Sequence, residues 1–241
     1  MPALLTCQEL TKRFGALVAL DGVSFEMAEG EIFGIAGPNG AGKTTLFNVL
    51  AGVHRGQGRA LFRGNDIIGL RSHQVCRLGI ARTFQIPEAF PSLPVSENVR
   101  IGAHFGAGLS GRDEEDEVRR AVEFVGLGDA MPRLARELKL LDKKRTMLAA
   151  ALATRPGLLL VDEPMSGLNP TEMKETVELF RRINGELGIG IIIIEHFMKV
   201  LSDLASRLLI LNFGQTVCID QPEVVLRDPR VIECYLGDDD A

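Results

Sequence analysis

Eight residues near the amino terminus carry the strongest chemical signal in the chain. Residues 37–44 run Gly-Pro-Asn-Gly-Ala-Gly-Lys-Thr and fit the spacing G-x-x-x-x-G-K-[ST]. The glycines let the backbone curl so that successive amides converge on one point, and a following helix adds the positive end of its dipole. Lys43 can reach β- and γ-phosphates, and the Thr44 hydroxyl can bind Mg²⁺. The segment predicts a loop that binds nucleotide phosphates, and a simple glycine-rich turn is the alternative.

The flanking residues support the same prediction. Residues 31–36 favour a short buried strand, and residues 44–50 favour the opening of a helix. A strand, a glycine-rich loop and a helix in this order form the usual setting of a phosphate loop. The residues expected to hold the nucleotide are Gly37, Pro38, Asn39, Gly40, Ala41, Gly42, Lys43, Thr44 and Thr45.

Two carboxylates follow a second apolar run. Residues 158–161 are Leu-Leu-Leu-Val, and Asp162 and Glu163 come directly after them. A carboxylate at the end of a parallel strand projects into the crevice where α/β sheets bind ligands. We expect Asp162 to hold Mg²⁺ through water, and Glu163 to orient and deprotonate an attacking water. The alternative is a pair of charged residues in a strand-ending turn.

His196 and Gln85 are weaker candidates when each is taken alone. His196 follows the apolar run 189–194, where it could hydrogen-bond a γ-phosphate, although a capping histidine explains it equally well. Gln85 lies just before Pro87 and could reach Mg²⁺ or the attacking water. A glutamine in a loop is also compatible with plain polar surface.

The elements that must position these residues fall into two kinds. Runs at 4–10, 18–27 and 60–63 alternate apolar and polar residues, which predicts a small antiparallel layer. Prolines at 87, 91 and 94 then break the pattern. Beyond them, residues 113–126 and 143–154 have helical spacing.

An α/β pattern resumes at Pro156. It predicts a buried strand at 158–161, a helix at 170–184, a strand near Ile191, a hairpin over 208–219, and two short helices after Pro222 and Pro229. We therefore expect one α/β domain, with a nucleotide-binding core of residues 1–86 and 157–241 and a helical subdomain of residues 87–156. The acidic tail at 238–240 is expected to be solvated.

Composition narrows the class of protein. The chain has 241 residues, 46% of them hydrophobic, and a net charge of -5, which favours a sizeable core and argues against a dedicated nucleic-acid binder. The four cysteines form no C-x-x-C pair, as expected for reduced thiols. The most apolar run is too short to span a bilayer, and no signal-peptide pattern opens the chain, so we expect an intracellular protein.

Taken in order along essentially the whole chain, these elements resemble the ATPase subunit of ATP-binding cassette (ABC) transporters. The resemblance implies a P-loop NTPase (RecA-like) core with an antiparallel β subdomain and an inserted α-helical subdomain. It implies that the enzyme hydrolyses ATP with Mg²⁺. The matching positions are Phe14 (stacking on adenine), residues 37–44 (Walker A), Gln85 (Q-loop, near Mg²⁺), residues 158–163 (Walker B), residues 166–169 (D-loop) and His196 (switch histidine).

Short segments narrow the resemblance to one branch of the family. The segments 79–85, 167–170, 194–196, 211–215 and 235–237 are similar to those of ATPases of branched-chain amino-acid importers. Urea and related amide importers belong to the same branch, and a lipopolysaccharide-export ATPase is similar in size and ending but less so around 82–85. The resemblance implies a second ATPase subunit, two integral membrane permease subunits and, indirectly, a periplasmic solute-binding protein. It also implies a place on the cytoplasmic face of the inner membrane.

One segment departs from the family pattern. A Leu-Ser-Gly-Gly-Gln signature is expected at the start of a helix about twenty residues before Walker B, and it closes over ATP held by the partner subunit. The residues found there are Leu138, Lys139, Leu140, Leu141 and Asp142. Lys139 could replace the serine contact with a charge, or the leucines could obstruct close approach. We therefore expect a heterodimer with an ATPase that carries a normal signature, and a homodimer would have two impaired sites.

The membrane permease subunits need a surface on which to dock. The resemblance places docking in a groove around Gln85, Ile86, Phe90 and Leu93.

Other classes of protein share the phosphate loop. A soluble cassette ATPase usually needs a long coiled coil or two cassettes, and neither is present. A small-molecule kinase would not need Gln85, Asn169 and His196 in this order.

Overall fold

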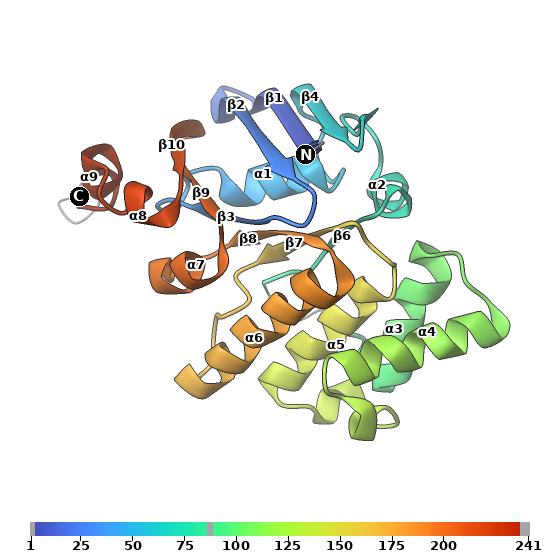
Figure 1. Cartoon of the computed structure of the whole chain (residues 1–241). Helices are drawn as coiled ribbons and strands as arrows, with labels where there is room; N and C mark the ends of the chain where they lie inside the picture. The colour runs from blue at the N-terminus through green and yellow to red at the C-terminus, as the bar shows by residue number, and fades with distance from the viewer. Residues whose placement is uncertain (1–2, 86–88, 237–241) are drawn as a thin grey trace.

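A computed structural model describes residues 3–85 and 89–236, and its framework is two sheets. The smaller sheet is antiparallel, in the order β2-β1-β4-β5. Its strands are β1 (Ala3–Phe14), β2 (Leu17–Ala28), β4 (Gln57–Phe62) and β5 (Asn65–Asp66). These strands confirm the predicted antiparallel layer, and Figure 1 shows it as the blue sheet above the rest of the molecule.

The larger sheet has the order β10-β9-β3-β8-β7-β6. Its parallel strands are β3 (Ile32–Ala36), β6 (Ile80–Arg82), β7 (Leu158–Asp162), β8 (Gly190–Ile194) and β9 (Arg207–Asn212), and β10 (Gln215–Asp220) runs antiparallel to β9 at one edge. The inner strands β3, β7 and β8 are fully buried, and β7 and β8 consist mainly of Leu, Ile and Val, whereas the edge strand β10 is exposed or partly buried throughout. Parallel pairing brings the carboxyl ends of β3, β7 and β8 to one edge, since Asp162 pairs with Ile194 and Ile35 pairs with Ile194.

Alternate residues of the large sheet face different layers. Leu158 and Leu160 pack with the antiparallel sheet and with helix α1 (Lys43–Leu50). Leu159 and Val161 pack toward the helices on the other face, which include α6 (Pro170–Leu187) and α7 (Met198–Leu204). The period-two alternation of a strand therefore builds two cores from one sheet.

A group of helices enters the chain between β6 and β7. The helices α3 (Val95–Ile101), α4 (Gly111–Phe124) and α5 (Leu140–Leu152) pack against one another, with a π-helical turn at Gly102–Gly106 and short 3-10 turns at Gly128–Ala130 and Ala135–Glu137. They lie together at the lower right in Figure 1. The subdomain division at residue 87 remains a prediction, and Ile86, Pro87 and the tail from Gly237 onward lie outside the described residues.

The remaining helices are short. They are α2 (Ser72–Leu78), α8 (Pro222–Val225) and α9 (Pro229–Leu236). Of the helices in the described part of the chain, none is long and apolar enough to cross a bilayer. The fold class expected from the sequence is confirmed, whereas α2, α3, α7 and β6 were not predicted because each has eight or fewer residues and little periodicity.

Candidate functional site

The phosphate loop (residues 37–44) connects β3 to α1 and depends on glycine at two points. Gly37 and Gly42 have φ angles of +144° and +103°, which L side chains rarely adopt. A Cβ atom on Gly37 would lie 2.0 Å from the Leu211 carbonyl oxygen, and one on Gly42 would lie 2.5 Å from that of Ala19. Both positions therefore require glycine for the loop to pack against its neighbours.

Lys43 folds back over this loop. Its Nζ donates hydrogen bonds to the carbonyl oxygens of Gly37 at 2.6 Å and Pro38 at 2.9 Å, and the residue is only 6% exposed. Burial lowers the pKa of the ammonium, while the charges of Glu163 and Asp162 oppose that effect. A phosphate in the loop would offer Lys43 a stronger, charge-assisted bond than neutral carbonyls do.

The rest of the loop is open to solvent on one side. Asn39, Gly40 and Thr44 are exposed, and Pro38 and Thr45 are partly buried. Ala41 is buried, and its carbonyl accepts a hydrogen bond from Gly214 N at 3.0 Å. Exposed amides at the start of α1 provide donors for an anion.

Phe14 lies at the end of β1 with its ring partly exposed. The ring packs edge-to-face against His54 at a centroid distance of 5.3 Å, and Lys12 Nζ lies 4.7 Å from its centroid. With 42% of the residue exposed, the ring has surface free for stacking. This arrangement fits the expected adenine contact, which remains a prediction.

Three sequence-predicted residues form one hydrogen-bonded group, here called the catalytic cluster: Gln85, Glu163 and His196. Glu163 directly follows β7, and its Oε1 lies 2.7 Å from His196 Nε2. Gln85 Nε2 donates to the other carboxylate oxygen, Oε2. Glu163 has a φ angle of +44°, unusual for a residue other than glycine, and its N–H bonds Ile194 O at 2.9 Å. The backbone thus directs the Glu163 side chain toward Gln85 and His196, which follow β6 and β8.

Asp162 is buried and paired with an arginine that sequence reasoning missed. Arg82 Nη2 donates to Asp162 Oδ2 at 2.9 Å, and Arg82 Nη1 donates to Asn48 Oδ1 at 2.6 Å. The guanidinium carbon also lies 5.6 Å from the centroid of the Phe47 ring and 5.0 Å from that of Phe84. Burial raises the pKa of Asp162, while the Arg82 bond opposes the rise. One carboxylate oxygen is thereby held by Arg82, and the two hydrogen bonds of the guanidinium join β6 to β7 and to α1.

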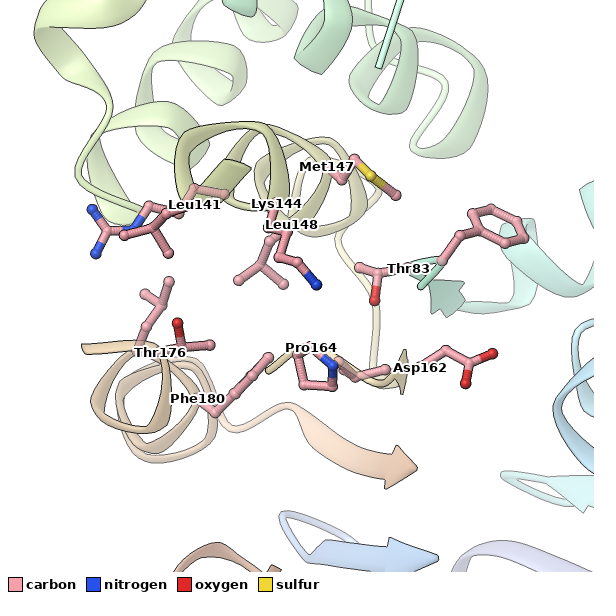
Figure 2. A pocket seen from close by; sticks show the side chains of 13 residues that line it. Thr83, Leu141, Lys144, Met147, Leu148, Asp162, Pro164, Thr176 and Phe180 are labelled. Carbon is pink, nitrogen blue, oxygen red and sulfur yellow. The ribbon is translucent and has the colours of Figure 1, made fainter. Parts of the chain in front are cut away.

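Glu195 and Lys144 contact the backbone of the catalytic cluster. Glu195 is 1% exposed and accepts hydrogen bonds from Met165 N at 2.7 Å and His196 N at 3.1 Å. Lys144 Nζ, on α5, lies 3.4 Å from the Glu163 carbonyl oxygen. Figure 2 shows Lys144 reaching from its helix toward Pro164 and Thr83, across a cavity of about 40 Å³. A charged residue next to His196 was a possible signal for Glu195, whereas nothing local marks Lys144.

The signature segment (residues 138–142) lies at the start of α5. Lys139 is the N-cap residue and Leu140 the first helical residue, three residues earlier than predicted. Leu138 is buried, but Leu140 is 39% exposed and lies over the D-loop, where a Cβ on Gly167 would be 2.8 Å from Leu140 Cδ2. The structure therefore places Leu140 beside the D-loop, while Leu141 lines the same cavity as Asp162 and Pro164.

A large groove opens between the helices and the Q-loop. Its volume is about 460 Å³. Phe84, Phe90, Ile101 and Met147 are among its lining residues. Of the residues expected there, Phe90 lines it, Gln85 and Leu93 do not, and Ile86 lies outside the described residues. Phe84, which was not predicted to line the groove, does so instead of its neighbour Gln85.

The donor set suits a hard cation. Thr44, Gln85 and Asp162 offer a hydroxyl, an amide oxygen and a carboxylate, and Mg²⁺ prefers a few such oxygens together with water and phosphate. Within residues 3–85 and 89–236, no three His, Cys, Asp or Glu side chains are grouped to cage a metal ion. An ion held by one carboxylate and a nucleotide is compatible with this arrangement.

Comparisons with known proteins agree with this geometry. Residues 20–166 match the family model described as ABC transporter, and residues 218–241 match the one described as branched-chain amino acid ATP-binding cassette transporter. The high-affinity branched-chain amino acid transport ATP-binding protein LivG of Escherichia coli (strain K12) is 36% identical, with 98% of each chain covered. The corresponding protein BraF of Pseudomonas aeruginosa is 33% identical over 98% of each chain.

Solved structures give the same result. The ADP conformation of MJ1267, an ATP-binding cassette of an ABC transporter, superposes with a TM-score of 0.88 at 30% identity and covers 98% of this chain and all of that one. The structure of cbiO1 from Clostridium perfringens, part of the ABC transporter complex cbiONQ, has a TM-score of 0.86 at 27% identity. That match covers 99% of this chain and 100% of the other.

Proposed function

The chain belongs to the ABC transporter family of ATPases, and on that basis we propose that it powers an importer of branched-chain amino acids. The observation that carries the proposal is the catalytic cluster beside the phosphate loop. Glu163 is held between Gln85 and His196 at the sheet edge where Lys43 emerges. Relatives whose names specify branched-chain amino acids, together with the match at residues 218–241, support this cargo.

The phosphate loop is proposed to grip ATP. The amides of residues 37–45 and the Lys43 ammonium would hold the phosphates, and Phe14 would stack on adenine. Lys43 would exchange its bonds to Gly37 O and Pro38 O for bonds to phosphate oxygens. Because the lysine is already aligned over the loop, little reorganisation is needed for binding.

Thr44, Asp162 and Gln85 are proposed to hold Mg²⁺. When bound, the ion would neutralise charge on the phosphate oxygens. Asp162 keeps one oxygen, Oδ1, free of the bond to Arg82, which allows it to receive a water of the ion. Gln85 would have to leave Glu163 to reach the ion, and the exposed position of Gln85 permits this movement.

Glu163 is proposed as the general base. Its carboxylate would orient the attacking water and take its proton as the bond to the γ-phosphate is broken. His196 would then donate from Nε2 to a γ-phosphate oxygen, since its present partner, Glu163 Oε1, would be engaged by water. The contacts seen between the three side chains keep them within reach of one reacting phosphate.

The site is proposed to be completed by a second ATPase subunit, and a heterodimer is favoured. The signature segment lacks the serine and glycines that meet a partner's γ-phosphate, while the residues of the chain's own site are in place. Leu140 supports this asymmetry because its exposed side chain occupies the approach beside Gly167. Purified alone, the chain should hydrolyse ATP slowly, and adding a partner with a normal signature should restore turnover. Full activity of the chain alone would contradict the heterodimer.

The groove is proposed to receive the docking segment of one permease subunit, and the second ATPase of the pair would receive that of the other permease subunit. The exposed rings of Phe84 and Phe90 support this, since an apolar surface of this size between elements favours a protein partner. The chain would then lie on the cytoplasmic face of the inner membrane, and a periplasmic binding protein would deliver the solute to the opposite side.

Uptake by cells lacking the chain tests the cargo. Loss of the chain should abolish ATP-dependent uptake of labelled leucine, isoleucine and valine. The wild-type chain should restore uptake, and the Glu163→Gln chain should not. Normal uptake of these amino acids with loss of urea uptake or of lipopolysaccharide export would overturn the proposed cargo while leaving the ATPase assignment in place.

A further inference from the structure

The carboxyl-terminal helix α9 has contacts that none of the proposed roles uses. It spans Pro229–Leu236 and lies at the end of the molecule where β9 and β10 form the sheet edge (Figure 1). Val231, a residue of this helix, is buried in the core, so the helix is anchored on its inner side. Two of its later residues, Cys234 and Tyr235, lie at the carboxyl edge of the large sheet.

Cys234 contacts the strand that supports the phosphate loop. Asn212 Nδ2, at the end of β9, donates to Cys234 Sγ at 3.2 Å. The preceding residue, Leu211, presents the carbonyl oxygen against which Gly37 packs. The strands β9 and β3 are paired in parallel up to Ala36 and Ile210, so this contact places α9 directly beside the first residue of the phosphate loop.

Tyr235 touches the loop itself and a second functional segment. Its hydroxyl donates toward Met198 Sδ at 3.9 Å, and Met198 is the first residue of α7, two residues after His196. Its phenol oxygen also faces the backbone amide of Gly37. Burial raises the pKa of the phenol, and the Gly37 backbone opposes the rise.

We propose that Tyr235 is a positioning residue that joins the start of the phosphate loop to the start of the helix carrying the switch histidine. The hydroxyl faces the Gly37 amide and donates toward Met198, while the neighbouring Cys234 binds the strand end against which Gly37 packs. A movement of either segment on binding nucleotide must therefore stretch or reorient this phenol. The inference deepens the proposed function and rests on it, because it assumes that residues 37–44 bind a nucleotide.

The chain contains a direct probe of this contact. Tyr235 is its only tyrosine, and it has no tryptophan, so ultraviolet-excited tyrosine emission comes from this position alone. Mg-ATP and Mg-ADP should change the tyrosine fluorescence lifetime of the full chain along the same curve as nucleotide binding. A lifetime is preferable to an intensity because adenine absorbs the exciting light. An unchanged lifetime at saturating nucleotide would overturn the proposal.

Substitution tests the same point without the optical signal. Tyr235→Phe keeps the ring and removes the hydroxyl, and it should weaken nucleotide binding roughly 3- to 10-fold, the usual effect of one lost hydrogen bond. Ile232→Ala changes an exposed residue of the same helix and should leave the affinity unchanged. If Tyr235→Phe lowers only the melting temperature and binds nucleotide normally, Tyr235 is a packing residue and the proposal is wrong.

Failure of the proposed function would look different. Lys43→Ala should weaken nucleotide binding about 10- to 150-fold and move the lifetime change to correspondingly higher nucleotide concentrations. If wild-type chain shows no nucleotide binding in a titration with a fluorescent ADP analogue, the nucleotide site itself is wrong. If binding is normal and depends on Lys43 but the lifetime stays constant, only the role of Tyr235 is refuted.

Discussion

The nucleotide-binding site and the signature segment differ in how firmly the surrounding structure fixes their residues. The phosphate loop and the catalytic cluster lie at the carboxyl edge of a buried sheet, where Lys43, Asp162 and Glu195 each have defined partners. The signature segment lies at the exposed start of α5. There Leu140 covers Gly167 instead of leaving the open glycine surface expected in the family.

The difference bears on the proposal that the chain contributes unequally to two nucleotide sites. Residues proposed to act on nucleotide bound to this chain are held by parallel strands, whose register determines which side chains meet. Residues proposed to act on the partner's nucleotide lie at the start of one helix, where the small residues of the family signature are absent. Changes made in matched pairs can test this proposal.

The largest expected effect is that of Glu163→Gln. Losing the general base should lower turnover about 10²- to 10⁴-fold while leaving nucleotide affinity nearly unchanged. Steady-state hydrolysis by the complex with its partner, together with nucleotide titration, measures both quantities. Asp142→Asn makes the same chemical change in the signature segment and should alter turnover by only a few-fold. Similar losses in the two variants would remove the distinction between the regions.

Arg82→Met should have the next largest effect, this time on stability. Removing one partner of the buried Arg82–Asp162 pair leaves an uncompensated carboxylate, which should cost about 3–5 kcal/mol of unfolding free energy. Arg145→Met breaks a more exposed pair between Arg145 on α5 and Glu175 on α6 and should cost less than about 1 kcal/mol. Urea unfolding of the two variants provides the measurement. Equal losses would show that the two regions are held with similar strength.

Lys43→Ala should weaken nucleotide binding about 10- to 150-fold, the effect of a lost hydrogen bond to a charged group. Titration of the isolated chain with a fluorescent ADP analogue gives the affinity. Lys139→Ala removes the lysine of the signature segment and should not change the affinity of the isolated chain, since Lys139 is exposed at the start of α5 and is proposed to face the partner's nucleotide. A matching loss in Lys139→Ala would place both lysines in one site.

The smallest expected effect comes from restoring the signature. Lys139→Ser with Leu140→Gly and Leu141→Gly should raise hydrolysis at the partner's site about tenfold, because one recovered hydrogen bond to phosphate contributes ~1.5 kcal/mol. Adding Glu163→Gln to the same chain silences its own site, so that the remaining activity reports the partner's nucleotide. Thermal melting must accompany the assay, since each glycine in a helix costs up to about 1 kcal/mol. Unchanged activity in a folded variant would show that the leucines do not impair that site.

Local patterns were sufficient for much of the fold and for the core of the candidate site. The phosphate loop is contiguous, and Asp162, Glu163 and His196 each follow a run of Leu, Val or Ile long enough to predict a buried parallel strand. Because such strands end at one edge, the side chains that follow them are expected to lie together on the strength of the sequence pattern alone. The roles assigned to these residues remain predictions.

Contacts that depend on distant partners could not be predicted. Arg82 and Asp162 are eighty residues apart, and nothing in either local pattern specifies their pairing. The bonds of Lys43 to its own loop, the position of Leu140 over Gly167 and the contacts of Tyr235 likewise depend on three-dimensional packing. The short elements β6, α2, α3 and α7 carry too few residues for periodicity to distinguish them from loops.

The common direction of the parallel strands has a practical consequence for handling this protein. All of the candidate chemistry leaves the sheet at its carboxyl edge, while the turn between α6 and β8 lies at the opposite edge, with Gly188 exposed there. A purification tag or reporter peptide inserted at that turn would stand away from the nucleotide. Engineered attachments belong on that side of the molecule.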